Sequence, residues 1–159
     1  MRFGLEMPMK DWLWVAVQVA LFGLYGALLL GTAAGEWGAW RWLGLPLMLA
    51  GLGCLLPALW AHGRKLTPLP EPRRELGLLR TGIYAVIRHP LYTGVMALAF
   101  GLAFWFQKAG ALGGAMLLTL FFNLKAREEE RRLQRLYPEY ADYQRTTGRF
   151  LPRWRKKAV

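Results

Sequence analysis

Four apolar tracts separated by polar segments dominate the hydrophobicity pattern of the chain. Residues 12–34, 42–61, 89–107 and 109–124 contain no Asp, Glu, Lys or Arg. The first tract has 23 residues, of which Gln18 is the most polar. At ~1.5 Å per residue, a helix of this length crosses the roughly 30 Å hydrocarbon core of a bilayer. A signal-peptide apolar region is shorter, so the pattern predicts a retained membrane span.

The second tract, Trp42 to Ala61, is predicted to be another span. It contains Pro46 and Pro57, which neighbouring helices can accommodate in a membrane. Tryptophans gather at its two ends, as expected for anchors at the membrane–water interface: Trp37, Trp40, Trp42 and Trp60.

The third and fourth tracts predict a helical hairpin over residues 91–124. Lys108 is the only charged residue in this stretch and marks the turn, together with Gln107 and Gly110. Each arm has nearly 16 residues, and this is about 24 Å of helix, slightly short of a full crossing. We therefore expect the fourth helix to continue past Leu124 into the polar segment that follows.

Small-residue spacings add little to this picture. Gly31-x-x-x-Gly35 and Gly110-x-x-x-Gly114 fit a close approach of two helices. Because glycine is common in membrane spans, we expect only lateral packing within the monomer, and nothing in the pattern indicates an oligomeric state.

The distribution of Lys and Arg predicts how the spans are oriented. Residues 62–90 contain six of these cations and residues 125–159 contain eleven, whereas the other two connections contain one each. The positive-inside rule then places both termini and the 62–90 loop in the cytoplasm.

The expected fold is a single all-α integral membrane domain, residues 1–159, with about four transmembrane helices. We divide it into two N-terminal spans, a cytoplasmic loop, the helical hairpin, and a cytoplasmic amphipathic helix with a basic tail: residues 1–61, 62–90, 91–124 and 125–159.

Composition excludes several other classes of protein. Apolar residues make up 55% of the 159 residues, which excludes a disordered chain. The formal charge of +11 arises from cations at the ends of apolar tracts, so membrane topology explains it and no nucleic-acid partner is expected. A single cysteine, Cys54, permits no internal disulfide, and no metal site is predicted.

A polar cluster lies immediately before the third tract. The residue before a proline is disfavoured in helical conformation, and proline suits the first helical position. His89 is therefore the predicted cap and Pro90 the first residue of the span, so the open amides of Leu91 and Tyr92 can attract an anionic group. Tyr84 and Tyr92 add aromatic faces. From these residues alone, an ordinary basic membrane boundary with tyrosine anchors fits equally.

An acidic cluster follows the fourth tract. If this helix continues, Glu129 lies within an apolar stripe made by Phe122, Leu133, Leu136 and Tyr137. Because an unpaired inward carboxylate is costly, we expect Glu129 to have a cationic partner, either Arg88 or a bound ligand. Glu128 and Glu130 are expected to point elsewhere, in solvated ion pairs with Arg127, Arg131 and Arg132.

These two clusters carry a family resemblance. The motif Gly-x-Tyr-x-x-x-Arg-His-Pro-x-Tyr-x-Gly at residues 82–94, the apolar hairpin, and Glu-Glu-x-x-Leu at residues 129–133 resemble the isoprenylcysteine carboxyl methyltransferase family and its bacterial relatives. Tyr140-Ala-Asp-Tyr143 and Arg149-Phe-Leu-Pro152 are also similar to that family. The resemblance covers roughly residues 65–152, whereas the first two spans carry no family signature.

The resemblance implies a membrane methyltransferase that uses S-adenosylmethionine and acts on a lipophilic acceptor, such as an isoprenylcysteine-like carboxylate or a lipid amine. The cofactor-binding residues that it implies are Leu76, Gly77, Leu78, Leu79, Tyr84, Arg88, His89, Pro90, Leu91, Tyr92 and Glu129. Family members often have a histidine in place of Leu76, so only a backbone contact is expected there.

The resemblance also implies a residue that handles the acceptor. The family's arginine aligns on Lys125, and lysine lacks the planar fork of arginine. Either the acceptor differs, or Arg127 takes this catalytic role.

Two alternatives remain open. Sterol-type membrane reductases resemble the C-terminal part but bind NADPH, for which Arg73, Arg74 and Arg80 are candidate 2′-phosphate ligands; the chain lacks the additional spans of those enzymes. A non-catalytic membrane protein is the other alternative, and in either case the basic tail, Arg149 to Lys157, is expected to bind anionic lipid headgroups. The high content of Leu, Arg, Gly and Ala suggests a bacterial inner-membrane protein.

Overall fold

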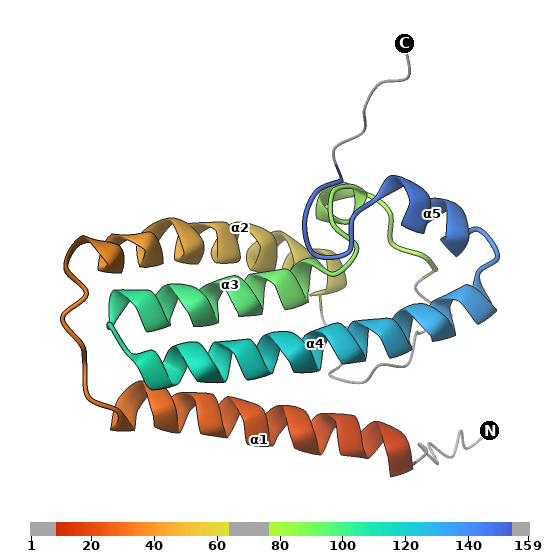
Figure 1. The fold of residues 1–159 in the computed structure, drawn as a ribbon. Coiled ribbons are helices and arrows are strands. Elements are labelled where there is room, and N and C mark those ends of the chain that lie inside the picture. The colour runs from red at the N-terminus through yellow and green to blue at the C-terminus, as the bar shows by residue number, and fades with distance from the viewer. Residues whose placement is uncertain (1–8, 64–76, 154–159) are drawn as a thin grey trace.

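The computed structural model describes residues 9–63 and 77–153. Four long helices are α1 (Met9–Gly31), α2 (Gly44–His62), α3 (Pro90–Trp105) and α4 (Ala109–Leu136). They lie side by side in the order α2, α3, α4, α1 (Figure 1). Shorter elements are the 3-10 helices η1 (Gly38–Leu43) and η4 (Gly82–Ala85) and the helix α5 (Tyr140–Thr146). The prediction of an all-α fold is confirmed.

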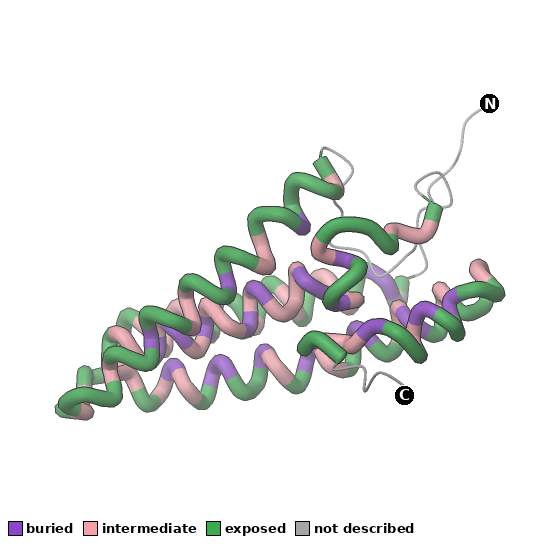
Figure 2. The backbone as a smooth tube through the Cα atoms, turned by 90° about the horizontal axis from the view of Figure 1, so that it is seen from above, coloured by how far each residue is buried: buried purple, intermediate pink, exposed green. Residues whose placement is uncertain are grey.

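The helices have the length and hydropathy of membrane spans. Those long and apolar enough to cross a bilayer run over Asp11–Gly31, Gly38–His62 and Ala109–Leu136, and Pro90–Trp105 is a shorter apolar helix. Large apolar side chains on α1 and α2 are exposed on the outside of the bundle (Figure 2), where lipid rather than water covers them. The protein is therefore an integral membrane protein, and α4 continues past Leu124 as predicted.

The α2 and α3 helices pack backbone against backbone. A Cβ atom at Gly44 would lie 2.5 Å from the carbonyl oxygen of Gly101, and one at Gly51 would lie 2.9 Å from that of Gly94. Both contacts are too short for any side chain. Since apolar side chains gain little by leaving lipid for protein, small residues that allow close van der Waals contact stabilise such a pair.

The glycine spacings noted in the sequence behave differently from one another. Gly110 and Gly114 pack against Thr32 and Tyr25 of the α1 side, whereas a Cβ at Gly31 would meet nothing within 4 Å. Close approach therefore occurs at one of the two motifs, within the monomer.

A buried core joins α1, α3 and α4. The hydroxyl of Tyr25 crosses from α1 and donates a hydrogen bond of 2.7 Å to the carbonyl oxygen of Ala99 on α3. The buried residues around it are Tyr25, Met96, Ala99, Ala103, Ala111, Ala115, Leu118, Phe121 and Phe122.

One end of the bundle is closed by two loops that meet. Gln107 has φ 57° in the turn between α3 and α4, and its side-chain oxygen accepts a hydrogen bond of 2.7 Å from the amide of Trp37. Lys108 donates to the carbonyl oxygen of Thr32. The start of α1, the end of α2, the start of α3 and the end of α4 consequently lie together at the opposite end (Figure 1).

The C-terminal segment returns to the start of α3. Arg88 and His89 donate their amides to the carbonyl oxygens of Gly148 and Arg149, at 2.9 and 3.0 Å. The hydroxyl of Thr93 donates to the carbonyl oxygen of Phe150 at 2.9 Å. The segment after α5 is thereby fixed against the residues that precede α3.

Candidate functional site

The start of α3 has the predicted backbone. Pro90 occupies the first helical turn and His89 is the N-cap residue, with φ −123° and ψ 62°. The His89 ring makes no capping hydrogen bond; it turns instead toward α4. The first amides of a helix have no intrahelical acceptor, so those of Leu91 and Tyr92 remain available to a ligand.

Glu130 is the most enclosed carboxylate of the acidic cluster. Its side chain is 3% exposed and lies 2.8 Å from Arg88 and 2.6 Å from Arg149. One of its oxygens is also 3.3 Å from Nε2 of His89, and Gln144 donates to the other at 3.2 Å.

The prediction that Glu130 forms only solvated ion pairs is therefore wrong. Periodicity along α4 defines the face of Glu130 but not what covers it. That face is covered by the cap residue of α3 and by the C-terminal return, through Arg88 and Arg149.

Glu129 turns toward the start of α3. It accepts a hydrogen bond of 2.9 Å from the hydroxyl of Tyr92 and lies 3.7 Å from Nδ1 of His89. The side chain is 27% exposed, so a ligand can still reach it. Arg88, one of its two expected partners, binds Glu130 instead, and that expectation is wrong.

Aromatic rings connect this polar cluster to the core. The rings of His89 and Tyr92 are stacked with centroids 5.3 Å apart and planes 6° apart. Tyr92 in turn stacks on Phe122 at 4.8 Å. The rings fix the orientation of the hydroxyl that meets Glu129.

Tyr84 is buried where η4 packs against α2. Its hydroxyl lies 3.0 Å from Nδ1 of His62, and its carbonyl oxygen accepts the hydroxyl of Tyr143. Burial, followed by the negative charge of Glu129, raises the pKa of Tyr84 above its ordinary value of 10.0. Burial also raises the pKa of Tyr143 to about 12. Both phenols are therefore protonated at neutral pH and able to donate hydrogen bonds.

The remaining predicted cofactor residues precede Tyr84. Gly77 is exposed with φ 61°, while Leu78 and Leu79 are half-buried. Leu76 lies outside the described residues, as do Arg73 and Arg74.

The two candidates for acceptor handling occupy different faces of α4. Lys125 is 1% exposed; its ammonium donates to the side chain of Gln18 and lies 5.9 Å from the centroid of the Tyr92 ring. Arg127 is exposed and lines a separate cavity. Only Lys125 joins the Tyr92 cluster. Gln18 was not predicted as a site residue, although its polarity within an apolar span was a visible signal.

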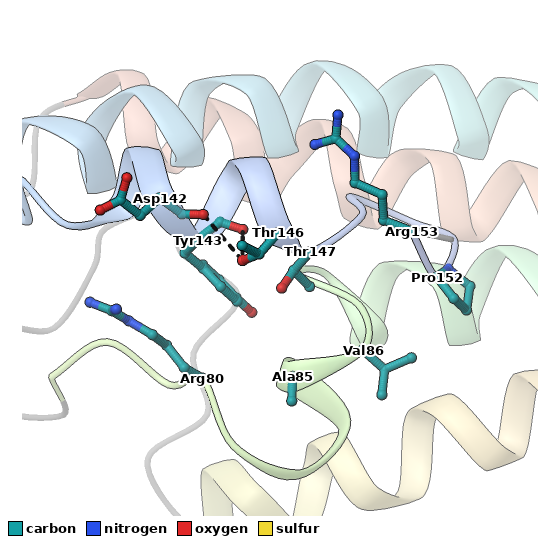
Figure 3. Close-up of a pocket in the computed structure, with 9 residues that line it drawn as sticks. All are labelled: Arg80, Ala85, Val86, Asp142, Tyr143, Thr146, Thr147, Pro152 and Arg153. Carbon is teal, nitrogen blue, oxygen red and sulfur yellow. Dashed lines mark hydrogen bonds between the residues drawn. The ribbon is translucent and has the colours of Figure 1, made fainter. Parts of the chain in front are cut away.

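Two cavities lie at this end of the molecule. One has a volume of about 590 Å³ and separates residues 80–86 from α5 and the C-terminal return (Figure 3). Arg80 and Asp142 stand at one end of it, and Pro152 and Arg153 at the other. The second, about 340 Å³, is lined by Arg127, Glu130, Arg131, Gln134, Gln144 and Arg149.

Taken together, the fold and the site define a multi-pass membrane protein with a polar, ligand-accessible cluster at one end of its bundle. Residues 39–140 match the phospholipid methyltransferase family, and the chain belongs to that family.

Relatives of known sequence include two resistance proteins. The nickel-cobalt-cadmium resistance protein NccN of Alcaligenes xylosoxydans xylosoxydans is 34% identical over 113 residues, which are 69% of this chain and 47% of that protein. The cobalt-zinc-cadmium resistance protein CzcN of Cupriavidus metallidurans is 32% identical over 110 residues, with the same two shares. The chain spans about half the length of these relatives. Within residues 9–63 and 77–153, no group of three or more His, Cys, Asp or Glu side chains is placed to hold a metal ion.

The fold is shared with a solved structure. The eukaryotic intramembrane Ras methyltransferase ICMT, an isoprenylcysteine carboxyl methyltransferase, matches with a TM-score of 0.61 and 20% identity. The match covers 94% of this chain and 55% of that one. With the family match, it confirms the resemblance predicted from the motifs.

Proposed function

We propose that the protein is an S-adenosylmethionine-dependent methyltransferase that acts on a lipophilic acceptor within the membrane. The observation that carries the proposal is the direct contact between the two sequence motifs. Tyr92 of the first motif binds Glu129 of the second at 2.9 Å, beside His89. Family membership supports the same reaction class.

The groups at the cluster fit the charged parts of this cofactor. A carboxylate has about four acceptor positions, and Tyr92 uses one of those of Glu129, so an ammonium or ribose hydroxyl group can bind there. The open amides of Leu91 and Tyr92 suit a carboxylate. When bound, the cofactor supplies an electrophilic methyl group on a sulfonium.

The chain's own residues bind and orient the reactants. The stacked rings of His89 and Tyr92 hold the Glu129 hydrogen bond in place. Lys125 offers a buried positive charge next to Tyr92, suited to an acidic group on the acceptor, and we assign acceptor handling to it rather than to Arg127. Holding two reactants in line accelerates transfer without acid–base catalysis when the acceptor is a carboxylate. An amine acceptor is the second possibility.

We also propose the location inferred from the basic segments: a bacterial inner membrane, with both termini in the cytoplasm. The clustering of the helix ends at one end of the bundle supports a common side for the two motifs (Figure 1). Reporter fusions at the two termini would test this orientation; activity of a periplasmic reporter at either terminus would contradict it.

Binding of S-adenosylhomocysteine tests the cofactor assignment. Glu129→Gln should weaken binding by about ten- to one-hundredfold, because a hydrogen bond to a charged group is lost. Glu128→Gln is the matched control, since Glu128 pairs with Arg131 and Arg132. Calorimetry should show nearly unchanged binding for the control. Equal losses for the two variants would contradict the role of Glu129.

NADPH in the same assay tests the reductase alternative. Arg80, one of its candidate ligands, lines the larger cavity (Figure 3). A thermal shift with NADPH and none with S-adenosylhomocysteine would favour the reductase. Incubation with labelled S-adenosylmethionine and a native lipid extract would then identify the methylated acceptor.

A further inference from the structure

The smaller cavity has no role in the proposed transfer site, although it lies at the same end of the bundle. It lies beside the outer face of α4 and is lined by three arginines and one carboxylate. That carboxylate, Glu130, is already bound by Arg88 and Arg149. The cavity therefore keeps an excess of positive charge, carried chiefly by Arg127 and Arg131.

An exposed apolar stripe on α4 leads to this cavity. Its members are spaced three or four residues apart, so they share one face of the helix. They are Met116, Leu117, Leu120 and Leu124, which are 61%, 45%, 57% and 46% exposed. Arg127 and Arg131 continue the same spacing and bring the stripe to the cavity.

The dimensions of the stripe match half a bilayer. From Met116 to Leu124 the helix rises ~12 Å, close to the ~15 Å of hydrocarbon in one leaflet. The arginines that follow therefore lie at the depth of lipid headgroups. A guanidinium group binds phosphate with two parallel hydrogen bonds and is the side chain best suited to it.

We propose that the stripe and the arginine cavity together bind one anionic phospholipid, with an acyl chain along the stripe and the phosphate beside Arg127 and Arg131. This lipid is distinct from the methyl acceptor. Arg127 is two residues from Lys125 and, at ~100° per residue, faces away from it. The proposal does not depend on the methyltransferase assignment.

Lipid titration of the purified, delipidated full chain tests the proposal. Native mass spectrometry would follow the binding of phosphatidylglycerol to the wild type and to Arg127→Gln/Arg131→Gln. The double variant should bind about tenfold or more weakly, because each arginine near an anionic headgroup contributes severalfold to binding. The charge-matched control is Arg135→Gln/Arg145→Gln, which removes two exposed cations that do not line the cavity; it should change binding little.

Each further arm separates this lipid from another ligand. Equal losses in the arginine variant and its control would replace the site with general attraction to charge. Phosphatidylcholine binding as tightly as phosphatidylglycerol would overturn the selectivity for anionic lipid. Inorganic phosphate displacing the lipid at equal concentration would overturn the role of the stripe.

A second variant and an activity assay complete the test. Leu120→Ala/Leu124→Ala should weaken lipid binding severalfold while leaving the arginines intact, and no loss would overturn the acyl contact. Methylation of the bound phosphatidylglycerol would make the cavity an acceptor site and overturn its separateness. If the arginine variant failed to fold, the lipid and phosphate arms on the wild type would still decide.

Discussion

Along the bundle α3 touches α2 through backbone, where Gly51 meets Gly94, whereas its first residues are fixed by charged side chains around Glu130. The two contacts lie on one helix, yet different forces stabilise them. In the apolar part, the fit of two surfaces without Cβ atoms permits dense van der Waals contact. At the polar end, burial strengthens the attraction of charges that α5 and the C-terminal return enclose.

This difference separates what holds the site from what serves it. Glu130 is saturated by Arg88, Arg149 and Gln144, so it fixes the start of α3 relative to α4. Glu129, one residue away, keeps an exposed carboxylate that a ligand can reach. Adjacent acids thus divide a structural role from the proposed binding role.

The largest effect is expected from Glu130→Gln. The change removes the negative charge and leaves Arg88, only 8% exposed, without its counter-charge. Breaking a buried ion pair on one side costs about 3–5 kcal/mol of stability. Unfolding of the detergent-solubilised protein by sodium dodecyl sulfate would measure the free energy.

Two controls show whether charge is the cause. Removing Arg88 as well, in Arg88→Met/Glu130→Gln, should recover part of the loss, because the uncompensated cation is gone. Asp142→Asn breaks an ion pair with Arg145 whose side chains are 66% and 77% exposed, so below about 1 kcal/mol should be lost. Glu130→Gln costing no more than Asp142→Asn would remove the contrast between the polar end and the spans.

The environment of Glu130 could not be predicted from the sequence for a physical reason. Periodicity fixed the direction of Glu129 because the stripe that contains it is local to α4. The partners of Glu130 come from residues 88, 144 and 149, and only tertiary folding brings these to α4. Local features were predicted better: the proline start of α3 and the extension of α4 beyond Leu124 are both present.

Gly51→Ala should have the next largest effect. Its Cβ would lie 2.9 Å from the carbonyl oxygen of Gly94 and from a side-chain atom of Leu98, so the helices must separate. Overpacking of this kind costs about 1–3 kcal/mol. The same unfolding titration would measure the loss.

Gly53→Ala is its matched control on the same helix. A Cβ at Gly53 would meet nothing within 4 Å, so stability should stay the same or rise by up to about 1 kcal/mol, the gain in helix propensity. If the two alanine variants unfolded alike, backbone contact would not hold α2 to α3.

The glycine contacts illustrate a signal that was present but unreadable without the fold. Gly44 and Gly51 are seven residues apart, as are Gly94 and Gly101, which places each pair on one face of its helix. The spacing alone does not say which helices pair or in which direction, and the sequence motif at Gly31 has the commoner spacing but no close neighbour. Pairing is decided by the whole bundle.

The smallest effect is expected where a single neutral hydrogen bond crosses the spans. Tyr25→Phe removes the hydroxyl that binds the carbonyl oxygen of Ala99, and that oxygen retains its helical partner. Such bonds inside membrane bundles contribute about 0.6 kcal/mol on average, so the loss should be below about 1.5 kcal/mol. Thr119→Val provides the comparison, since the Thr119 hydroxyl bonds within its own helix. A loss from Tyr25→Phe as large as that from Glu130→Gln would mean that polar contacts stabilise the spans and the polar end alike, and the distinction between shape and charge would fail.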